Sequence, residues 1–189
     1  MTVRRPFAFL DRDGTLNREQ SFVTTPDELV VLPGARAAVT ALDDAGFRIV
    51  VVTNQSGIAR GLYDEATLAR IHAKLHDALD RRPLAYLHCP HLPEATGPYG
   101  GACECRKPAG GMLESAVATF GGTLSGAFVV GDAGRDVGMA ATAPLRRILV
   151  RSGKDWRHEL QVATGLGVAP DAVVDDVRAA ADWILATLR

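Results

Sequence analysis

The chain has 189 residues, of which 47% are apolar and 23% charged, so it can bury a sizeable core as one domain and has the composition of a soluble globular protein. A formal net charge of −1 excludes the basic surface typical of nucleic-acid-binding proteins, and no apolar run reaches the ~18 residues that a membrane-spanning helix needs. Residues 1–6 lack the apolar stretch of a signal peptide, so we expect a cytoplasmic protein and, by default, a monomer.

Predicted strands and helices alternate along most of the chain. In the first half, the apolar pattern predicts a strand at residues 7–10, a helix at 34–46, a strand at 47–53 and a helix at 64–79. In the second half it predicts a helix at 110–120, a strand at 127–131, a short helix at 136–142, strands at 147–150 and 173–174, and a helix at 177–188. No element is predicted for residues 18–32, 81–108 or 152–170. Alternation of this kind indicates an α/β fold of three layers, with a parallel sheet between two layers of helices.

Two carboxylates directly follow the first predicted strand. Because side chains alternate along an extended chain, Asp11 and Asp13 emerge on the same side at the carboxyl end of the strand, where open α/β sheets bind ligands. A hard cation such as Mg²⁺ offsets the repulsion between two charges this close. A carboxylate beside a second carboxyl group also suits a nucleophile next to a general acid/base. For these two residues alone, the alternative is a solvated turn that closes the strand.

Polar residues also follow the next two long strands. Thr53 and Asn54 end the second strand, and Asp132, with Asp136 shortly after it, follows the strand at 127–131. The carboxyl ends of parallel strands share one edge, so we expect these groups to meet the first two carboxylates there. A hydroxyl and an amide suit phosphate oxygens, and Asp132 adds an oxygen ligand for the cation. Taken singly, the alternatives are that Thr53 only ends its strand and that Asp132 lies in an ordinary turn.

A phosphate group beside these carboxylates requires positive charge as well. Arg106 and Lys107 are the candidate pair, because Lys107 precedes Pro108 and the helix at 110–120 and can therefore reach the same edge of the sheet. The alternative is a solvated surface lysine, which is the usual fate of this residue type.

All three cysteines lie in the long segment without a predicted element. Cys89 and His91 are followed, twelve residues after the histidine, by Cys103 and then Cys105. Three sulfurs and one imidazole make a closed tetrahedral set for a structural Zn²⁺, which would order a loop that has no core of its own. The alternative is three free cysteines and a surface histidine.

The remaining histidines suggest no site. His72 and His76 are four residues apart on a predicted helix, but no third ligand is evident, so we expect them on a solvated helix face. His88 and His158 receive no role.

Four strings of residues together resemble the zinc-containing branch of the haloacid dehalogenase superfamily of phosphatases. They are Phe-Leu-Asp-Arg-Asp-Gly-Thr-Leu-Asn at 9–17, Val-Val-Thr-Asn-Gln-Ser-Gly-Ile-Ala-Arg-Gly at 51–61, Cys-Pro-His at 89–91 with Cys-Glu-Cys-Arg-Lys-Pro at 103–108, and Val-Gly-Asp at 130–132 with Asp136. The resemblance spans roughly residues 7–150. Within this branch, the second string favours the heptose-1,7-bisphosphate phosphatases over the histidinol-phosphate phosphatases, which share the fold, the zinc loop and the pair of aspartates.

The resemblance implies a Rossmann-like haloacid dehalogenase fold in one domain, residues 1–189, with no large cap domain and with a zinc-stapled loop at about 84–108. It implies Mg²⁺-dependent removal of the 7-phosphate from a heptose 1,7-bisphosphate through an aspartyl-phosphate. A small sugar phosphate would be the partner, with neither nucleic acid nor membrane.

The resemblance also implies roles for single residues. Asp11 would be the nucleophile and Asp13 the acid/base, while Thr53 and Lys107 would stabilise the transferring phosphoryl group. The predicted Mg²⁺ ligands are Asp11, the backbone carbonyl of Asp13, and Asp132, with Asp136 as a supporting carboxylate. The predicted substrate contacts are Glu19, Gln20, Ser21, Phe22, Asn54, Gln55, Ser56 and Arg106.

The chain departs from this branch at two places. The family usually has Gly-Tyr where this chain has Ser21-Phe22, and a basic residue commonly stands where this chain has Ala133, a charge that Arg135 would replace. Histidinol phosphate, or another small sugar phosphate, therefore stays open as the substrate. A zinc-stapled binding module without catalysis is a further alternative, but it predicts a broken catalytic position, and none is broken here.

Overall fold

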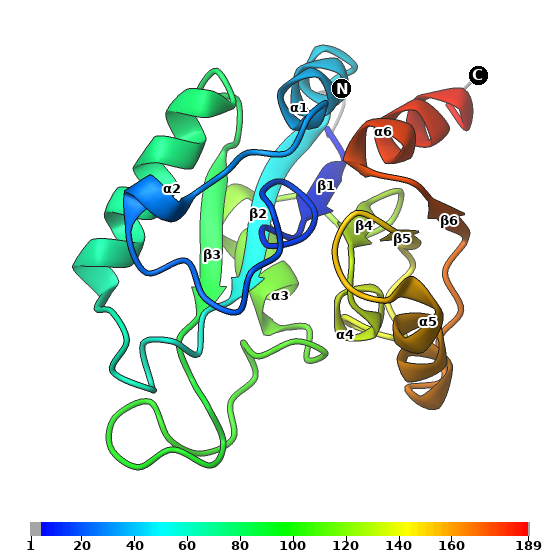
Figure 1. Cartoon of the computed structure of the whole chain (residues 1–189). Coiled ribbons are helices and arrows are strands. Elements are labelled where there is room, and N and C mark those ends of the chain that lie inside the picture. Colours follow the sequence, from blue (N-terminus) through cyan, green and yellow to red (C-terminus); the bar gives the residue numbers. More distant parts are fainter. Residues whose placement is uncertain (1–4, 189) are drawn as a thin grey trace.

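The computed structural model describes residues 5–188 and contains a six-stranded, fully parallel sheet (Figure 1). Residues 1–4, which hold most of the stretch used to judge a signal peptide, lie outside the described residues. The strand order is β3-β2-β1-β4-β5-β6. The strands are β1 Phe7–Leu10, β2 Arg48–Asn54, β3 Ala85–Cys89, β4 Phe128–Gly131, β5 Arg146–Val150 and β6 Ala172–Val174.

Helices connect the strands as the alternating pattern predicted. They are α1 Ala35–Asp44, α2 Glu65–Ala78, α3 Gly111–Phe120, α4 Gly134–Val137, α5 Trp156–Gly165 and α6 Val177–Ala186, with a short 3-10 helix, η1, at Pro26–Glu28. Asp64 caps the start of α2, because its carboxylate accepts a hydrogen bond of 2.7 Å from the Thr67 amide. Within the described residues, no helix is long and apolar enough to cross a membrane.

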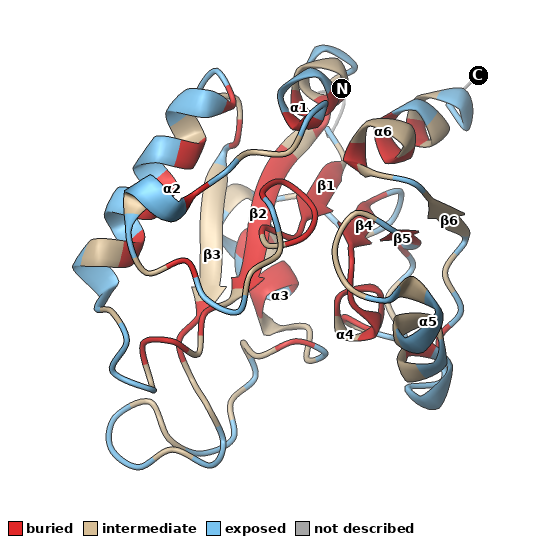
Figure 2. Ribbon diagram, viewed as in Figure 1, coloured by how far each residue is buried: buried red, intermediate tan, exposed pale blue. Residues whose placement is uncertain are grey.

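Helices cover both faces of the sheet, as predicted. On one face, α1, α2 and α6 pack against alternate strand residues such as Leu10 and Val51. On the other face, α3 packs against Phe9 and Val129, while α4 and α5 pack against Leu149. Figure 2 shows the central strands fully buried and the outer surfaces of the helices exposed. Burial on both faces explains why these strands have continuous apolar runs rather than alternating ones.

Besides the short helix η1, which lies inside the segment 18–32, three elements differ from the sequence-based predictions. A strand, β3, lies inside the segment 81–108, and α5 lies inside 152–170, where no element was predicted. The strand β3 is at the edge of the sheet and half-buried, and α5 has a single fully buried residue, Ala163, so neither carries a strong apolar pattern. The helix predicted at 136–142 begins and ends earlier, as α4, because the Asp136 carboxylate accepts a hydrogen bond of 3.0 Å from the Ala133 amide at its start.

The register of the central strands places the predicted site residues at one edge. Leu10 pairs with Val51 of β2 on one side and with Val130 of β4 on the other. The residues that follow these three positions, including Asp11, Thr53 and Asp132, therefore come together at the carboxyl ends of the strands.

Candidate active site

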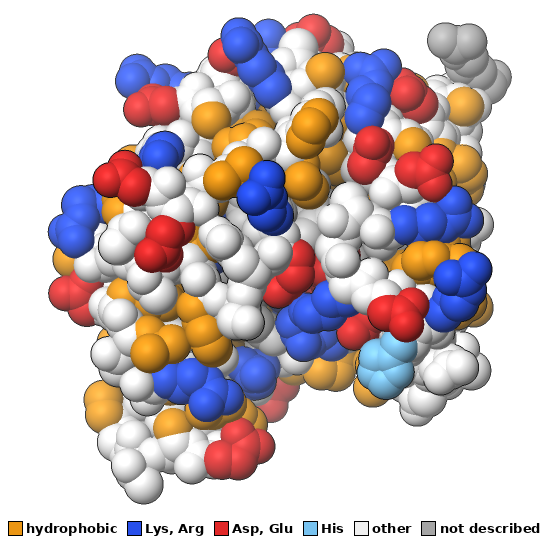
Figure 3. Space-filling model, in the orientation of Figure 1, with side chains coloured by type: hydrophobic (Ala, Val, Ile, Leu, Met, Phe, Trp, Pro, Cys, Tyr) orange, Lys and Arg blue, Asp and Glu red, His pale blue; other side chains and the backbone are white. Residues whose placement is uncertain are grey.

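A polar cavity of about 240 Å³ opens at the carboxyl ends of β1 and β2. Its walls come from the loops after these two strands, from residues 106–107 and from two single positions, 135 and 154. All predicted substrate contacts line it, as do the four predicted catalytic residues: Asp11, Asp13, Glu19, Gln20, Ser21, Phe22, Thr53, Asn54, Gln55, Ser56, Arg106 and Lys107. On the face shown in Figure 3, acidic and basic side chains lie next to one another near the centre.

Three buried carboxylates lie together, and one of them, Asp11, lines this cavity. The carboxylate oxygens of Asp11, Asp132 and Asp136, which we call the carboxylate cluster, lie within 4.8 Å of one another. The Lys107 ammonium donates a hydrogen bond to Asp11 and lies 2.8 Å from Asp136 Oδ1. The structure thus joins one predicted nucleophile, two predicted metal-site carboxylates and one predicted phosphate-binding cation.

Burial and mutual repulsion perturb the carboxylates strongly. Burial, together with the charge of Asp136, raises the pKa of Asp11 to about 7 and the pKa of Asp132 to about 8. Burial alone would also raise the pKa of Asp136, but Lys107 and Arg135 hold it below its ordinary value. Two of the three carboxylates therefore lack enough positive charge nearby to ionise easily.

Lys107 is buried, so the alternative of a solvated surface lysine is wrong. Its ammonium donates to the Val52 carbonyl at 2.9 Å, and its backbone is held by Asn54, whose side chain accepts from the Lys107 amide at 3.1 Å and donates to its carbonyl at 3.3 Å. Burial would lower the pKa of Lys107, but Asp11 and Asp136 raise it above its ordinary value. The side chain is therefore a fixed cation that faces the cavity.

Asp13 lies apart from the carboxylate cluster and is held by donors. Arg12 donates to it from Nη2 at 2.9 Å, Asn17 at 3.0 Å and Gln55 at 3.0 Å. Burial alone would raise the pKa of Asp13, but Arg12 and the hydrogen bonds from Asn17 and Gln55 lower it. The carboxyl group is therefore ionised in the free protein.

Sequence reasoning missed Arg12, which is 1% exposed and lies beneath Asp13. Strand alternation places Arg12 on the opposite side from the two aspartates, so nothing in the sequence indicates that its guanidinium contacts the Asp13 carboxylate at 2.9 Å. The expectation of solvated histidines on α2 is wrong for His72, which is buried with Nε2 3.4 Å from Arg12 Nη1. Burial, Arg12 and His88 lower the pKa of His72 to about 3.

Gly14 shows why a glycine follows the two aspartates. Its φ of +81° lies in the left-handed region, which favours glycine. A Cβ atom there would also lie 2.6 Å from Asp132 Cγ. The turn after β1 can therefore approach the carboxylate from β4 only because residue 14 has no side chain.

The carboxylate cluster fits a divalent metal ion such as Mg²⁺. Three buried carboxylates supply the oxygen ligands that hard cations prefer, and a cation would relieve the repulsion that raises the pKa values of Asp11 and Asp132. The Asp13 side chain points to Arg12 instead, so the predicted ligand from this residue is its backbone carbonyl, and that role stays a prediction.

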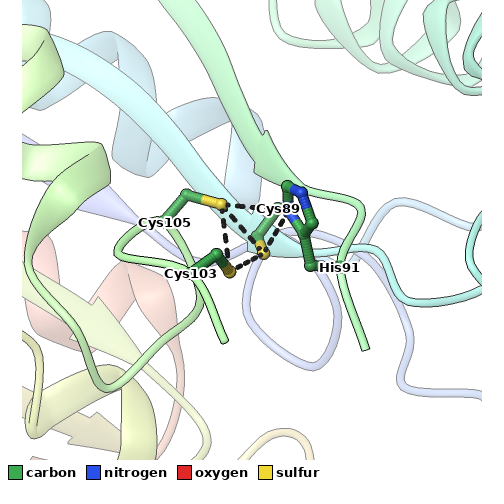
Figure 4. Close-up of side chains that lie close together, drawn as sticks. All are labelled: Cys89, His91, Cys103 and Cys105. Carbon is green, nitrogen blue, oxygen red and sulfur yellow. Dashed lines mark hydrogen bonds between the residues drawn. The ribbon is translucent and has the colours of Figure 1, made fainter. Parts of the chain in front are cut away.

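A second group of potential metal ligands lies in the loop between β3 and α3. The side chains of Cys89, His91, Cys103 and Cys105, which we call the thiolate cluster, converge in Figure 4. Their sulfurs are 3.1 to 3.5 Å apart, and His91 Nδ1 lies 3.4 Å from the Cys105 sulfur. Tetrahedral Zn²⁺ with Zn–S bonds of ~2.3 Å separates its sulfur ligands by about 3.8 Å, so small movements suffice to seat the ion.

The thiolate cluster adjoins the cavity. The Cys89 carbonyl, at the end of β3, accepts a hydrogen bond of 2.7 Å from the Gln55 amide. Arg106 follows the last cysteine directly, and its guanidinium donates to the His91 carbonyl at 2.9 Å. A metal in the thiolate cluster would therefore fix the backbone that carries Arg106 and Lys107.

Two further cations in the cavity wall were not predicted as contacts. The Lys154 ammonium lies 4.0 Å from a Glu19 carboxylate oxygen. Arg135, noted in the sequence only as a replacement charge, forms no hydrogen bond or ion pair among the described residues, and its Nε is buried without a partner. Burial would lower the pKa of Arg135, but the charges of Asp136, Asp11 and Asp132 raise it.

The chain is similar to known proteins over most of its length. A family profile described as HAD-hydrolase-like matches residues 104–180. The D-glycero-β-D-manno-heptose-1,7-bisphosphate 7-phosphatase of Bordetella bronchiseptica is 39% identical over 180 residues, which cover 93% of this chain and 96% of the relative. The enzyme of the same name from Photorhabdus laumondii is 36% identical over 171 residues, covering 88% of this chain and 91% of the relative.

A solved structure extends the likeness to the fold. The crystal structure of D,D-heptose 1,7-bisphosphate phosphatase from B. bronchiseptica, complexed with magnesium and phosphate, matches with a TM-score of 0.82 and 37% sequence identity. The match covers 96% of this chain and 99% of that chain. With similarity over nearly its whole length and a shared architecture, this chain belongs to the haloacid dehalogenase-like family of heptose-1,7-bisphosphate 7-phosphatases.

Proposed function

We propose that the chain is a Mg²⁺-dependent phosphatase that removes the 7-phosphate of D-glycero-D-manno-heptose 1,7-bisphosphate. The observation that carries this proposal is the buried contact between Asp11 and Lys107 in the wall of an open polar cavity, beside Asp132 and Asp136. The names of the relatives, and the magnesium and phosphate in one related structure, support the choice of substrate and ion.

The first chemical step uses Asp11 as the nucleophile. One of its carboxylate oxygens forms a bond to phosphorus while the bond between phosphorus and the sugar oxygen breaks. Lys107 and the Thr53 hydroxyl stabilise the negative charge on the phosphoryl oxygens, because both are fixed at the edge of the cavity before substrate enters. The product of this step is an aspartyl-phosphate.

Asp13 moves the protons in both steps. It donates a proton to the departing sugar oxygen, and then accepts one from the water that cleaves the aspartyl-phosphate and regenerates the Asp11 carboxylate. The surroundings of Asp13 lower its pKa, so before substrate binds this residue is an ionised carboxylate that can act as a base. The negative charge of the bound substrate favours the protonated form that the first step requires.

The two clusters would hold different ions. Mg²⁺ bound to Asp11, Asp132 and the Asp13 carbonyl would supply positive charge for the phosphoryl group. Zn²⁺ in the thiolate cluster would have four protein ligands and no open position, which suits a structural role.

A substrate with a second phosphate accounts for the extra cations of the cavity. Arg106, Arg135 and Lys154 line the cavity in addition to Lys107. Arg106 and Lys154 already have partners, whereas the Arg135 guanidinium has none among the described residues. We assign the second phosphate to Arg135, because a cation without a partner gains most from an anionic ligand.

Under the same proposal, residues 1–189 form one domain and the protein is a cytoplasmic monomer, as the sequence-based expectation had it. Gel filtration of the purified protein tests the monomeric state, since a dimer would elute at twice the mass.

Phosphate release in the presence of Mg²⁺ tests the proposed function. The substrates are both anomers of D-glycero-D-manno-heptose 1,7-bisphosphate, with histidinol phosphate and fructose 1,6-bisphosphate alongside. We expect a kcat/KM for one heptose anomer at least about a hundredfold above that for the other esters, which corresponds to about 2.7 kcal/mol. Faster turnover of histidinol phosphate would reverse the choice of substrate. Weak and equal activity on all esters would show that Ser21, Phe22 and Ala133 belong to a different specificity.

A further inference from the structure

Gln55 has every hydrogen-bonding position of its side chain occupied. It lies directly after β2 and is 3% exposed. Its Nε2 donates to Thr53 Oγ1 at 2.8 Å and to Asp13 Oδ2 at 3.0 Å, while its Oε1 accepts from Arg12 Nη2 at 3.1 Å and from the Tyr63 hydroxyl at 2.6 Å. A carboxamide has two N–H groups and about two acceptor positions, so none remains for a ligand.

The hydrogen-bond partners of Gln55 determine which terminal atom of its carboxamide is the oxygen and which is the nitrogen. The Arg12 guanidinium only donates, so the atom that faces it is the oxygen, and the ionised Asp13 carboxylate only accepts, so the atom that faces it is the nitrogen. The nitrogen therefore donates to the Thr53 oxygen as well. Thr53 accepts this bond and keeps its own O–H free to donate elsewhere, and the cavity lies on its open side.

We propose that Gln55 is a positioning residue that fixes the side chains of Asp13 and Thr53 and leaves the Thr53 hydroxyl to donate to the transferring phosphoryl group. This replaces the expectation of a substrate contact for the Gln55 side chain. The inference rests on the proposed phosphatase chemistry, because it takes Asp13 as the acid/base and Thr53 as the phosphoryl ligand.

Tyr63, which also lines the cavity, supports Gln55. It lies in the segment between β2 and α2, and its hydroxyl closes the set of hydrogen bonds on Gln55. Gly57 makes this approach possible, because a Cβ atom at that position would lie 2.7 Å from the Tyr63 hydroxyl oxygen. Tyr63 thus contacts Gln55, and Gln55 in turn contacts Asp13 and Thr53, the two residues at the phosphoryl group.

Replacing Gln55 separates positioning from sugar binding. Gln55→Leu removes all four hydrogen bonds, whereas Gln55→Glu turns the donation to Asp13 into an acceptor–acceptor contact and draws the Thr53 O–H away from the phosphoryl group. We expect kcat to fall about tenfold to hundredfold with KM within about threefold, and by the same factor on the heptose bisphosphate and on p-nitrophenyl phosphate, because only the phosphoryl end is affected. A rise in KM for the sugar substrate alone, with kcat unchanged, would overturn the proposal.

The second ester also separates this inference from the choice of substrate. If the wild-type protein hydrolyses p-nitrophenyl phosphate but not the heptose bisphosphate, the proposed substrate is wrong, and the effect of Gln55→Leu on the simple ester still decides the role of Gln55.

Two tyrosines offer a matched pair of variants. Tyr63→Phe removes one bond to Gln55, and we expect kcat to fall about threefold to tenfold. Tyr86→Phe is the control, because the Tyr86 hydroxyl is buried without a hydrogen-bond partner among the described residues and lies outside the cavity lining. Equal losses of kcat in both variants would show a general effect of the substitution and would contradict the proposed chain of contacts.

A crystal structure of the Gln55→Leu variant tests the inference without any assay. We expect the Asp13 or Thr53 side chain to adopt a different rotamer from the one that Gln55 holds. If both side chains keep their positions in a well-folded variant, Gln55 does not fix them and the proposal fails.

Discussion

The thiolate cluster and the carboxylate cluster differ in how the chain builds them. All four members of the thiolate cluster come from one segment, residues 89–105, which begins at the last residue of β3 and continues as a loop (Figure 1). The carboxylate cluster joins Asp11, after β1, to Asp132 and Asp136, after β4, and the two strands are neighbours in the sheet. The first cluster can order a loop, whereas the second is placed by the fold itself.

They also differ in what remains open to a ligand. Four side chains fill a tetrahedral sphere, so the thiolate cluster has no position for a substrate. The carboxylate cluster has three side chains and adjoins a cavity of about 240 Å³. Because an octahedral cation keeps further positions for water or phosphate oxygens, only the carboxylate cluster can take part in the reaction. The contrast shows how one chain separates a structural ion from a catalytic one.

The largest expected effect comes from disabling the carboxylate cluster alone. Asp11→Asn removes the nucleophile, and we expect kcat to fall at least about a thousandfold while the zinc content stays at one ion per chain. Asp182→Asn is the control, because that residue is exposed on α6 and its one ion pair among residues 5–188 is with Arg178. Substantial turnover by Asp11→Asn would remove Asp11 from the role of nucleophile.

Disabling the thiolate cluster should have a smaller and indirect effect on turnover. In His91→Ala we expect the zinc to be lost and kcat to fall about tenfold to hundredfold, because the loop no longer holds Arg106 and Lys107 in place. His158→Ala, an exposed histidine on α5, should retain both zinc and activity. Full activity in a zinc-free His91→Ala protein would show that the cluster does not support the active site.

Arg135→Gln tests whether Arg135 binds the second phosphate of the substrate. Losing one charge-assisted contact to the second phosphate should raise KM for the bisphosphate about tenfold, with little change for p-nitrophenyl phosphate. Arg157→Gln, on the surface of α5 and outside the cavity lining, serves as the control. An equal loss of kcat/KM on both substrates would place Arg135 at the reacting phosphoryl group instead.

The smallest effect expected is on stability as a function of pH. In protein stripped of Mg²⁺, the pKa values of Asp11 and Asp132, about 7 and 8, lie above their ordinary value, so the folded form binds protons more tightly than the unfolded form. The stabilisation is complete below the ordinary pKa and is lost as the pH rises through 7 and 8. We therefore expect Tm to fall between pH 6.5 and 9.

Mg²⁺ should reverse this loss, because the ion takes the place of the two protons. The increase in Tm on adding Mg²⁺ should be larger at pH 9 than at pH 6.5, and Asp132→Asn should reduce it. A Tm that does not depend on pH in this range, with and without Mg²⁺, would contradict the assignment of the ion to the carboxylate cluster.

Sequence alone predicted the features that follow from topology. Parallel strands bring their carboxyl ends to one edge, so the meeting of Asp11, Thr53 and Asp132 could be predicted without coordinates. The thiolate cluster could be predicted because all its ligands lie in one short segment. The edge strand β3 and the helix α5 were missed because each buries too little apolar surface to leave a clear period.

The contacts beneath the site could not be predicted, because they depend on rotamers and on residues far apart in sequence. Gln55 was expected to contact the substrate, and nothing in the sequence indicated that its side chain also bonds to Asp13, Arg12 and Tyr63. Nothing local indicates that His72 packs beside Arg12, or that the Arg135 guanidinium is left without a partner.

The measurement that most directly tests the separation of the two ions is metal content together with turnover. The protein is purified, treated briefly with EDTA, analysed for zinc and magnesium, and assayed before and after each ion is added back. We predict one zinc ion per chain after this treatment, no turnover without added metal, and full turnover on adding Mg²⁺ alone. Turnover that returns only with zinc, or that persists when neither ion is bound, would contradict the account of a structural thiolate cluster and a catalytic carboxylate cluster.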